Sequence, residues 1–553
     1  MTIAAEVDWL AQSLDADHEI ASVQYAPGAR RHAPSWRTVC VVGGGTAGYF
    51  AALGLRRAFP SLEITLVESS RIPIIGVGEA TVPGIVGFLH HLLQIDQHEF
   101  YRQVMPTWKL GIRFEWGLSE PYHFNAPFDW SSNAVGILGS LREHGDIRDM
   151  TIESMMMARN VSPVFQTENG DVQSLLHHVP FAYHFDVQHL VKYLAKLAKE
   201  RGIRHLDKRI VSTIPRNDGQ AVDAIVTDEG ERLAFDVFID CTGFQSLLLE
   251  KTLGSPFVSY ADSLYTDSAL AFTLPHDGQP KPYTTATTMD AGWCWSIPQR
   301  HEDHLGYVFA SAFLSEADAR REIARRVGAA DARLVKFRSG RHQEAWRGNV
   351  IAIGNASGFI EPLQSTGVMM IANAVGMLVD LWPETDDYDA LRRVYNKRSA
   401  ELWDGLRWLI AVHYKFNTRL ETPFWKEARH SVNVSGAGEV IAAFEQLAPL
   451  HLRQGLVRRE LAATREIAFF GLAAYDCMLL GQGVKCDVMP SGESHEAWLA
   501  RRNRVAGALA AALPVSRALD LVGESPAWLD ALLTDKSSWV RQLFPLSEFL
   551  ANA

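Results

Sequence analysis

The pattern of hydrophobic and polar positions divides the chain into three parts. Near the N-terminus, Val7, Leu10 and Leu14 fall at helical spacing and predict a short amphipathic helix, and a Pro- and Gly-containing linker follows at 25–35. We expect this helix either to pack on the main body or to bind a partner. Short apolar strands, glycine turns and helices then alternate, before a largely helical pattern begins. The predicted parts are an N-terminal extension over 1–36, an α/β core over 37–386 and a mainly helical region over 387–553.

The α/β core opens with a strand, a glycine loop, a helix and a second strand. The strands are predicted at 38–42 and 62–68, and the helix passes through Tyr49 to Leu53. Further along, the amphipathic stretch 186–201 predicts a helix that Gly202 ends. Additional strands are predicted at 233–240 and 349–353. This alternation indicates an α/β fold with a parallel sheet.

Composition and charge exclude several classes of protein. The 553 residues carry a net charge of −11 and no long basic run, which argues against nucleic acid or an anionic membrane as a partner. The five cysteines have irregular spacing and no CxxC pair, so neither a disulfide framework nor a metal site is expected. No apolar run reaches the ~20 residues that span a bilayer, and no signal pattern is present. These features predict a soluble, cytoplasmic protein.

The glycine loop predicts a dinucleotide site. Gly43, Gly44, Gly45, Thr46, Ala47 and Gly48 contain the G-x-G-x-x-G spacing between a strand and a helix. These glycines allow a tight turn, close approach of a pyrophosphate and close packing of helix on strand. Glu68 lies at the end of the next strand, where a carboxylate binds ribose hydroxyls. Two later strand-to-glycine turns, at 239–243 and 348–358, favour FAD over NAD.

Three further segments resemble the flavin-dependent tryptophan halogenases. They are GVGEATVP at 76–83, GWCWSIP at 292–298 and GNASGFIEPLQSTGVMM at 354–370. The resemblance runs from Arg37 to Gln482, and W-x-W-x-I-P is its most specific marker. It implies a Rossmann-like FAD-binding domain of the flavin monooxygenase type with a mainly helical C-terminal substrate region. It also implies that Ser69, Ala80, Asn355 and Val368 contact the cofactor.

The resemblance implies a halogenation chemistry. Reduced FAD, oxygen and chloride or bromide yield hypohalous acid, which passes through a tunnel to a lysine. Trp293, Trp295 and Pro298 separate flavin from substrate, and the backbone of Thr366 and Gly367 binds the halide. Lys109 stands at the place of the family's lysine, and its apolar neighbours suggest desolvation and a lowered pKa. Because the chain shows no second nicotinamide-binding domain, a separate flavin reductase is expected to supply FADH2.

Departures from the family pattern leave the substrate open. The glutamate that faces the lysine in tryptophan-specific members is Gln364, which can hydrogen-bond but cannot act as a base. Phe128 stands in an altered His-Pro-Phe-Gly phrase and, with Trp425, is a candidate substrate contact. The expected substrate is the indole of tryptophan, free or within a peptide, while pyrroles and phenols stay open. The alternatives are a flavin monooxygenase and a halogenase-like flavin-binding protein with little activity, and a homodimer is one assembly that fits.

Overall fold

A six-stranded, mostly parallel sheet carries the predicted dinucleotide loop. Its order is β10-β2-β1-β14-β23-β22, and only the pair β22–β23 is antiparallel. The apolar runs of β1 and β2 are buried on both faces, as expected for parallel strands inside an α/β layer. The strands are β1 (Thr38–Val42), β2 (Glu63–Glu68), β10 (Arg204–Asp207), β14 (Val237–Asp240), β22 (Trp346–Arg347) and β23 (Val350–Ala352).

The structure is a computed structural model. It describes residues 36–72, 78–128, 151–166, 172–176, 179–328, 331–383, 387–451, 471–487, 494–524 and 529. The helix and linker predicted before position 36 lie outside the described residues.

Two helices pack on the helix that follows the glycine loop. α2 (Thr46–Ala58) contacts both α7 (Val187–Glu200) and α9 (Gly367–Asp380). α7 is the predicted amphipathic helix, and Asp186 caps it by accepting the backbone N–H groups of Gln188 and His189. α2 and α9 approach closely at Gly54, where an added Cβ would lie 2.6 Å from Val375. The cofactor loop therefore rests on a fixed helical layer.

The strand predicted over 233–240 is wrong as a single element. Arg232–Leu233 forms β13, which pairs with β12 (Val222–Thr227) in a separate sheet with β11 (Ile210–Pro215). Only Val237–Asp240 joins the parallel sheet. The chain leaves strand geometry before Asp236, whose carboxylate accepts the backbone N–H groups of Arg37 and Thr38. This side-chain contact ends one strand and anchors the start of β1.

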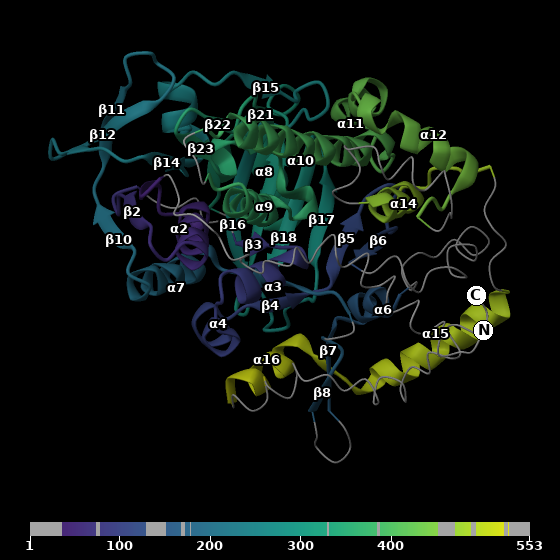
Figure 1. Cartoon of the computed structure of the whole chain (residues 1–553). Helices are drawn as coiled ribbons and strands as arrows, with labels where there is room; N and C mark the ends of the chain where they lie inside the picture. Colours follow the sequence, from purple (N-terminus) through teal and green to yellow (C-terminus); the bar gives the residue numbers. More distant parts are fainter. Residues whose placement is uncertain are drawn as a thin grey trace, which may run out of the picture.

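A seven-stranded sheet lies beside the parallel sheet, and a small three-stranded sheet joins them. The large sheet has the order β20-β16-β19-β18-β17-β5-β6, and the small one β3-β9-β4. Figure 1 shows the parallel sheet at one end, helices α11, α12 and α14 at the other, and strands of the seven-stranded sheet between them. The large sheet contains β5 (Gly111–Glu115), β6 (Phe124–Pro127), β16 (Ser268–Pro275), β17 (Thr284–Met289), β18 (Gly292–Pro298), β19 (Glu302–Phe309) and β20 (Arg333–Lys336); the small one contains β3 (Glu79–Ala80), β4 (Thr107–Lys109) and β9 (Ala182–Phe185).

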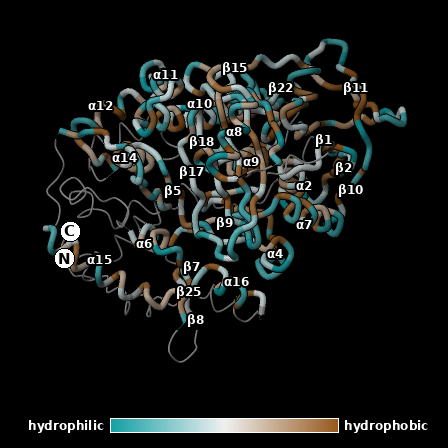
Figure 2. Tube along the Cα trace, turned by 180° about the vertical axis from the view of Figure 1, so that it is seen from behind, coloured by the Kyte–Doolittle hydropathy of each residue, from teal (hydrophilic) through white to brown (hydrophobic). Residues whose placement is uncertain are grey.

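Beyond position 387 the described chain is mainly helical, as predicted. Its helices are α10 (Asp389–Phe416), α11 (Pro423–Ser431), α12 (Gly438–Leu447), α14 (Gly471–Gly481), α15 (His495–Ala508) and α16 (Val515–Glu524). α10 buries Trp403 and Trp408 in the apolar core that also holds β18. Figure 2 shows hydrophobic segments concentrated in the middle of the molecule and hydrophilic segments toward its edges. Within the described ranges, no helix is long and apolar enough to cross a membrane.

The remaining elements complete the layers around these sheets. They are α3 (Gly84–Gly87), α4 (Gln97–Val104), α6 (Ile152–Arg159), β7 (Val161–Gln166), β8 (Val172–Ser174), α8 (Glu316–Val327), β15 (Phe257–Ser259), β21 (Gly340–His342), β24 (Gly358–Phe359) and β25 (Ala512–Pro514).

Candidate active site

The glycine loop has the geometry of a dinucleotide cradle. Gly43 adopts φ +114°, and Gly45 is the N-cap of α2. A Cβ on Gly48 would lie 1.8 Å from the carbonyl oxygen of Gly43, so only glycine fits there. No atom lies within 4 Å of a Cβ built on Gly45, which leaves space at the helix N-terminus. Thr46 and Ala47 begin the helix, so this end presents free backbone N–H groups toward an anion.

The carboxylate of Glu68 lies beside this loop. A Cβ on Gly44 would lie 1.4 Å from Glu68 Oε2. Glu68 Oε1 accepts a hydrogen bond from the Tyr49 hydroxyl at 2.8 Å and contacts His205 Nε2 at 2.7 Å. Ser69, next in the chain, is buried, and its hydroxyl has no hydrogen-bond partner among the described residues. An unpaired buried hydroxyl beside an oriented carboxylate fits a site for ribose hydroxyls.

Turns after β14 and β23 close the same edge. Asp240 holds the first turn by accepting the backbone N–H groups of Thr242, Leu248 and Leu249. In the second turn, Asn355 is exposed although its neighbours are buried. Ala80 and Val368 are both buried, and their contact with the cofactor stays a prediction. The open space above the glycines and the unpaired Ser69 hydroxyl fit an FAD molecule lying along this edge.

The proposed halide-binding residues stand at the start of α9. Thr366 is its N-cap and Gly367 its first residue. Ser365 precedes them with φ +58°, a conformation unusual for a non-glycine residue. Gly367 is exposed, and no atom lies within 4 Å of where its Cβ would stand. A tight turn leading into a helix N-terminus presents backbone N–H groups that favour an anion.

The two tryptophans that are predicted to separate flavin from substrate lie together on β18. Trp293 and Trp295 are both buried, with ring centroids 6.0 Å apart. Trp295 pairs with Gly306 on β19, where an added Cβ would lie 2.0 Å from the indole. Gly306 therefore provides the room in which the Trp295 ring lies flat. Pro298 ends the strand, and its carbonyl accepts a hydrogen bond from the Thr107 hydroxyl at 3.0 Å.

Lys109 is fully buried at the end of β4. Its ammonium nitrogen donates to the carbonyl oxygen of Thr81 at 2.9 Å and lies 5.3 Å from the centroid of the Phe128 ring. Burial lowers the pKa of Lys109 well below the ordinary value of lysine. The strand and the desolvation predicted from the sequence are therefore both present, and the surroundings of Lys109 disfavour its charged form.

A buried histidine, His184, contacts the strand that carries Lys109. His184 on β9 contacts the hydroxyl of Thr107 at 3.2 Å and that of Thr284 at 2.9 Å. Burial lowers the pKa of His184 well below its usual range, and the charge of Lys109 acts in the same direction. β9 pairs with β3 through Ala80 and with β4 through Thr107. His184 was not predicted as a site residue, because its partners Thr107 and Thr284 are far from it along the chain.

Gln364 forms a specific pair with a second buried histidine. Its amide nitrogen lies 2.7 Å from His413 Nε2, while His413 Nδ1 lies 2.7 Å from the carbonyl oxygen of Leu409. Burial lowers the pKa of His413 to about 4, so the ring is neutral at pH 7. Nδ1 then carries the proton, and Nε2 accepts from the amide. The Gln364 carbonyl oxygen stays available as an acceptor.

Glu361 is a buried carboxyl group in the same motif. The hydroxyls of Thr266 and Tyr414 both donate to it. Burial raises the pKa of Glu361 to about 7, although these hydrogen bonds and the Trp293 indole act in the opposite direction. The sequence analysis assigned Glu361 no role. The one feature of the sequence that could have drawn attention to Glu361 is an acidic residue between apolar neighbours in this motif.

The two candidate substrate contacts, Phe128 and Trp425, lie in different surroundings. Phe128 lies over Lys109 and is partly exposed, as a substrate contact requires. Trp425 is fully buried, donates its indole N–H to the carbonyl of Met289 at 2.7 Å, and stacks on Tyr414 with centroids 5.6 Å apart. Trp425 thus belongs to the core and gives a substrate no surface to contact, contrary to the expectation from sequence. Across the described ranges, no group of three or more His, Cys, Asp or Glu residues could hold a metal.

Comparison with known proteins identifies this arrangement. A model of the tryptophan halogenase family matches residues 38–495, which includes the glycine loop, the lysine strand, the barrier and the helical region. The chain belongs to this family. This tryptophan halogenase is therefore a flavoprotein and an oxidoreductase that uses FAD and a halide, and its fold is that of the flavin-dependent halogenases.

Two relatives are named as tryptophan halogenases, and one solved structure is named as a lanthipeptide tryptophan halogenase. The halogenase is 36% identical over 440 residues to a 7-chloro-L-tryptophan 6-halogenase of Kutzneria sp. (strain 744), covering 74% of this chain and 85% of the relative. It is 32% identical over 431 residues to a tryptophan 7-halogenase of Lentzea aerocolonigenes, covering 73% and 81%. Among solved structures, MibH, a lanthipeptide tryptophan 5-halogenase, has 48% identity and a TM-score of 0.85, covering 94% of this chain and 100% of MibH.

Proposed function

We propose that the chain halogenates the indole of a tryptophan held within a peptide, using FADH2, oxygen and chloride or bromide. The observation that carries the proposal is Lys109, a buried lysine of lowered pKa at the end of a strand tied to the barrier through Thr107 and Pro298. The higher identity to a lanthipeptide halogenase than to the two compared tryptophan halogenases supports a peptide substrate.

Each site residue has a proposed task. Bound FAD supplies, with oxygen and halide, the hypohalous acid that the reaction consumes. Thr366 and Gly367 hold the halide through backbone N–H groups, and Trp293 with Trp295 keeps the organic substrate away from the flavin. Lys109 donates a hydrogen bond to hypohalous acid, or its amine takes the halogen as the oxygen–halogen bond breaks, and the released hydroxide leaves with the amine proton as water. The aromatic carbon then gains the halogen, and its C–H proton leaves to water.

Gln364 orients the oxidant in this proposal. Its N–H side is held by His413, so its carbonyl oxygen can accept the O–H of hypohalous acid. Proton loss from the halogenated ring restores aromaticity and does not require a strong base. The amide at 364 is therefore compatible with activity.

Substrate binding is proposed to involve Phe128 and to exclude direct contact with Asp476. Phe128 offers a ring face beside Lys109 for stacking on indole. Asp476, in helix α14, is fully buried and accepts the backbone N–H groups of Leu450 and His451. It organises the helical region and leaves the recognition of substrate to other residues.

The supply of reduced cofactor is the remaining part of the proposal. We infer that a separate flavin reductase provides FADH2 in the cytoplasm. Five free, buried cysteines suit a reducing compartment. A homodimer stays a prediction.

The deciding experiment is a mass-spectrometric assay with FAD, a flavin reductase and chloride or bromide. Peptides containing one tryptophan are compared with free tryptophan, indole, pyrrole and phenol. Replacement of one ring hydrogen by halogen is expected with the wild-type chain and with Lys426→Ala, an exposed-lysine control, and is expected to be lost in Lys109→Ala. Full activity of Lys109→Ala contradicts the proposed mechanism, and oxygen insertion without halide supports a monooxygenase instead.

A further inference from the structure

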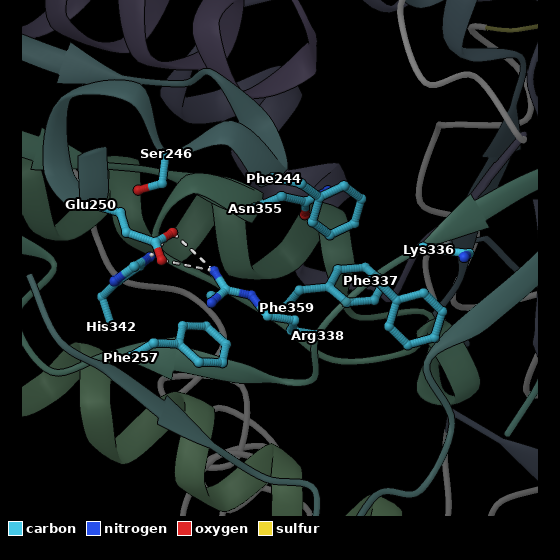
Figure 3. A pocket seen from close by; sticks show the side chains of 11 residues that line it. Phe244, Ser246, Glu250, Phe257, Lys336, Phe337, Arg338, His342, Asn355 and Phe359 are labelled. Atoms are coloured by element: carbon cyan, nitrogen blue, oxygen red, sulfur yellow. Dashed lines mark hydrogen bonds and ion pairs between the residues drawn. The ribbon is translucent and has the colours of Figure 1, made fainter. Parts of the chain in front are cut away.

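A cavity of about 240 Å³ lies beside the cofactor edge, and Asn355, a predicted cofactor contact, is one of its lining residues. Figure 3 shows four phenylalanine rings in its walls, together with charged side chains that include Glu250, Lys336 and Arg338. The rings are those of Phe244, Phe257, Phe337 and Phe359.

The rings form an ordered aromatic wall. Phe359 contacts Phe244 and Phe337 edge to face, with centroid distances of 4.9 Å in both pairs. Such pairs favour a third flat ring that completes an edge-to-face or offset stack. The wall therefore suits a planar aromatic group.

The charge of the cavity is positive. Arg338 is neutralised by Glu250, with atoms 2.9 Å apart, and also lies over the Phe257 ring at 4.2 Å. His342 lies 3.7 Å from Glu250, and burial lowers its pKa. Lys336 is exposed and has no ion-pair partner in the part of the chain that the structure describes. The lining thus keeps one uncompensated cation, which favours an anionic ring.

The cavity shares two turns with the proposed FAD site. Phe244 lies in the turn Gly243–Gln245 after β14, and Asn355 lies in the turn Gly354–Ala356 after β23. These two strands are parallel neighbours, so both turns stand at the carboxyl edge where the glycine loop begins the cradle. A cofactor lying along this edge would have the cavity next to it.

We propose that this cavity is a second position for the isoalloxazine ring of bound FAD, occupied while the cofactor is loaded or exchanged. This inference rests on the proposed external supply of FADH2. A halogenase supplied in this way must admit the reduced flavin and release the oxidised flavin in every cycle. Reduced flavin is an anion at neutral pH, so Lys336 favours the reduced ring, while the phenylalanine wall accepts the ring in both oxidation states.

The first test uses the fluorescence decay of oxidised FAD bound to the full chain. Tryptophan quenches flavin emission by electron transfer, whereas phenylalanine does not. A ring beside Trp293 and Trp295 is therefore dark, and a ring in the cavity emits. Wild type is expected to show a nanosecond component that Phe337→Trp shortens at least fivefold. Phe313→Trp, an exposed position outside the cavity, should leave it unchanged. Phe244→Trp gives the same readout from a less buried wall position.

A second test measures the rate at which dithionite-reduced FAD loads under anaerobic conditions. Lys336→Ala is expected to slow loading several-fold, with a smaller effect on oxidised FAD, while Lys426→Ala loads like wild type. The equilibrium affinity should change by about twofold or less, because a position that is occupied only during loading and exchange contributes little to the bound population.

Three outcomes overturn the inference. They are identical fluorescence decays in wild type and both cavity variants, identical loading rates in all lysine variants, and a cavity that binds a separate aromatic anion instead. The last is detected with indole-3-carboxylate, if it shifts the emission of the tryptophan in Phe337→Trp while the flavin decay stays as in wild type. The halogenation assay with chemically reduced FAD reports on the proposed function separately, so the two failures are distinguishable.

Discussion

Replacing Gln364 with glutamate tests most directly whether Gln364 donates a hydrogen bond to a neutral His413. In the structure, the Gln364 amide donates to the unprotonated Nε2 of His413, and His413 Nδ1 is held by the Leu409 carbonyl. A carboxylate at 364 would place an oxygen lone pair against the Nε2 lone pair. The carboxylate and the His413 ring can then lie in contact only if one of them takes up a proton. Gln364→Glu is therefore expected to destabilise the protein and to lower its activity.

The magnitude follows from the pKa of His413. With a value of about 4, adding a proton to the buried ring costs roughly 4 kcal/mol at pH 7 and about 1.4 kcal/mol at pH 5, at 1.36 kcal/mol per pH unit. These are upper limits, because the new ion pair offsets part of the cost. The unfolded chains of wild type and variant share the same histidine. The stability difference between them should hence shrink by up to about 2.7 kcal/mol from pH 7 to pH 5.

The assay is urea unfolding of wild type, Gln364→Glu and Gln364→Glu/His413→Gln at both pH values, with halogenation measured in parallel. The double variant restores an amide N–H opposite the carboxylate and should recover part of the stability at pH 7. If Gln364→Glu is as stable as wild type at pH 7, and its relative stability does not change at pH 5, His413 is not a neutral acceptor. A large gain of activity in the single variant would instead indicate a chain that lacks catalysis for want of this glutamate.

Three further outcomes are expected. Lys109→Met should lose halogenation. Wild type should gain stability relative to this variant from pH 7 toward pH 10, by at most about 1.36 kcal/mol per pH unit, because the lowered pKa makes the folded lysine release its proton at a lower pH than the unfolded lysine does. Parallel stability curves in urea would refute the buried amine. Gly44→Ala should abolish FAD binding in equilibrium titration, since its Cβ would overlap Glu68; unchanged affinity would show that the loop relaxes. Glu361→Gln should gain stability relative to wild type as the pH rises from 5 to 7, by at most about 3 kcal/mol, because the folded wild type holds a proton that its unfolded chain releases. If the stability difference in thermal unfolding does not change with pH, Glu361 is ionised in the folded protein.

The sequence predicted features that depend on local chemistry. The glycine loop, β1, α2 and β2 follow from spacing, and α7 follows from an amphipathic pattern with an aspartate cap. Lys109 was predicted on a strand and desolvated because its immediate neighbours are apolar, and the structure confirms both. These predictions needed no knowledge of distant contacts.

Features created by distant contacts could not be predicted. His413 meets Gln364 across 49 positions, and Lys109 meets Thr81 across 28, so neither partner is visible in a local pattern. The strand expected over 233–240 ends early because Asp236 binds backbone groups almost 200 positions away. Trp425 has the kind of aromatic side chain that stacks on ligands. Only its position in the folded core shows that it offers no surface to a substrate.

Strand β9 has a consequence for engineering the substrate range. It lies between β3, which leads from the cofactor side, and β4, which ends at Lys109. Neighbouring strands are about 4.8 Å apart, so backbone pairing holds β3 and β4 at a separation of roughly 10 Å. Loop grafts around Phe128 or in the C-terminal helices leave this spacing untouched. New substrates are therefore best sought by exchanging those peripheral segments, while insertions or deletions within 79–80, 107–109 or 182–185 would alter the path of the oxidant for every substrate.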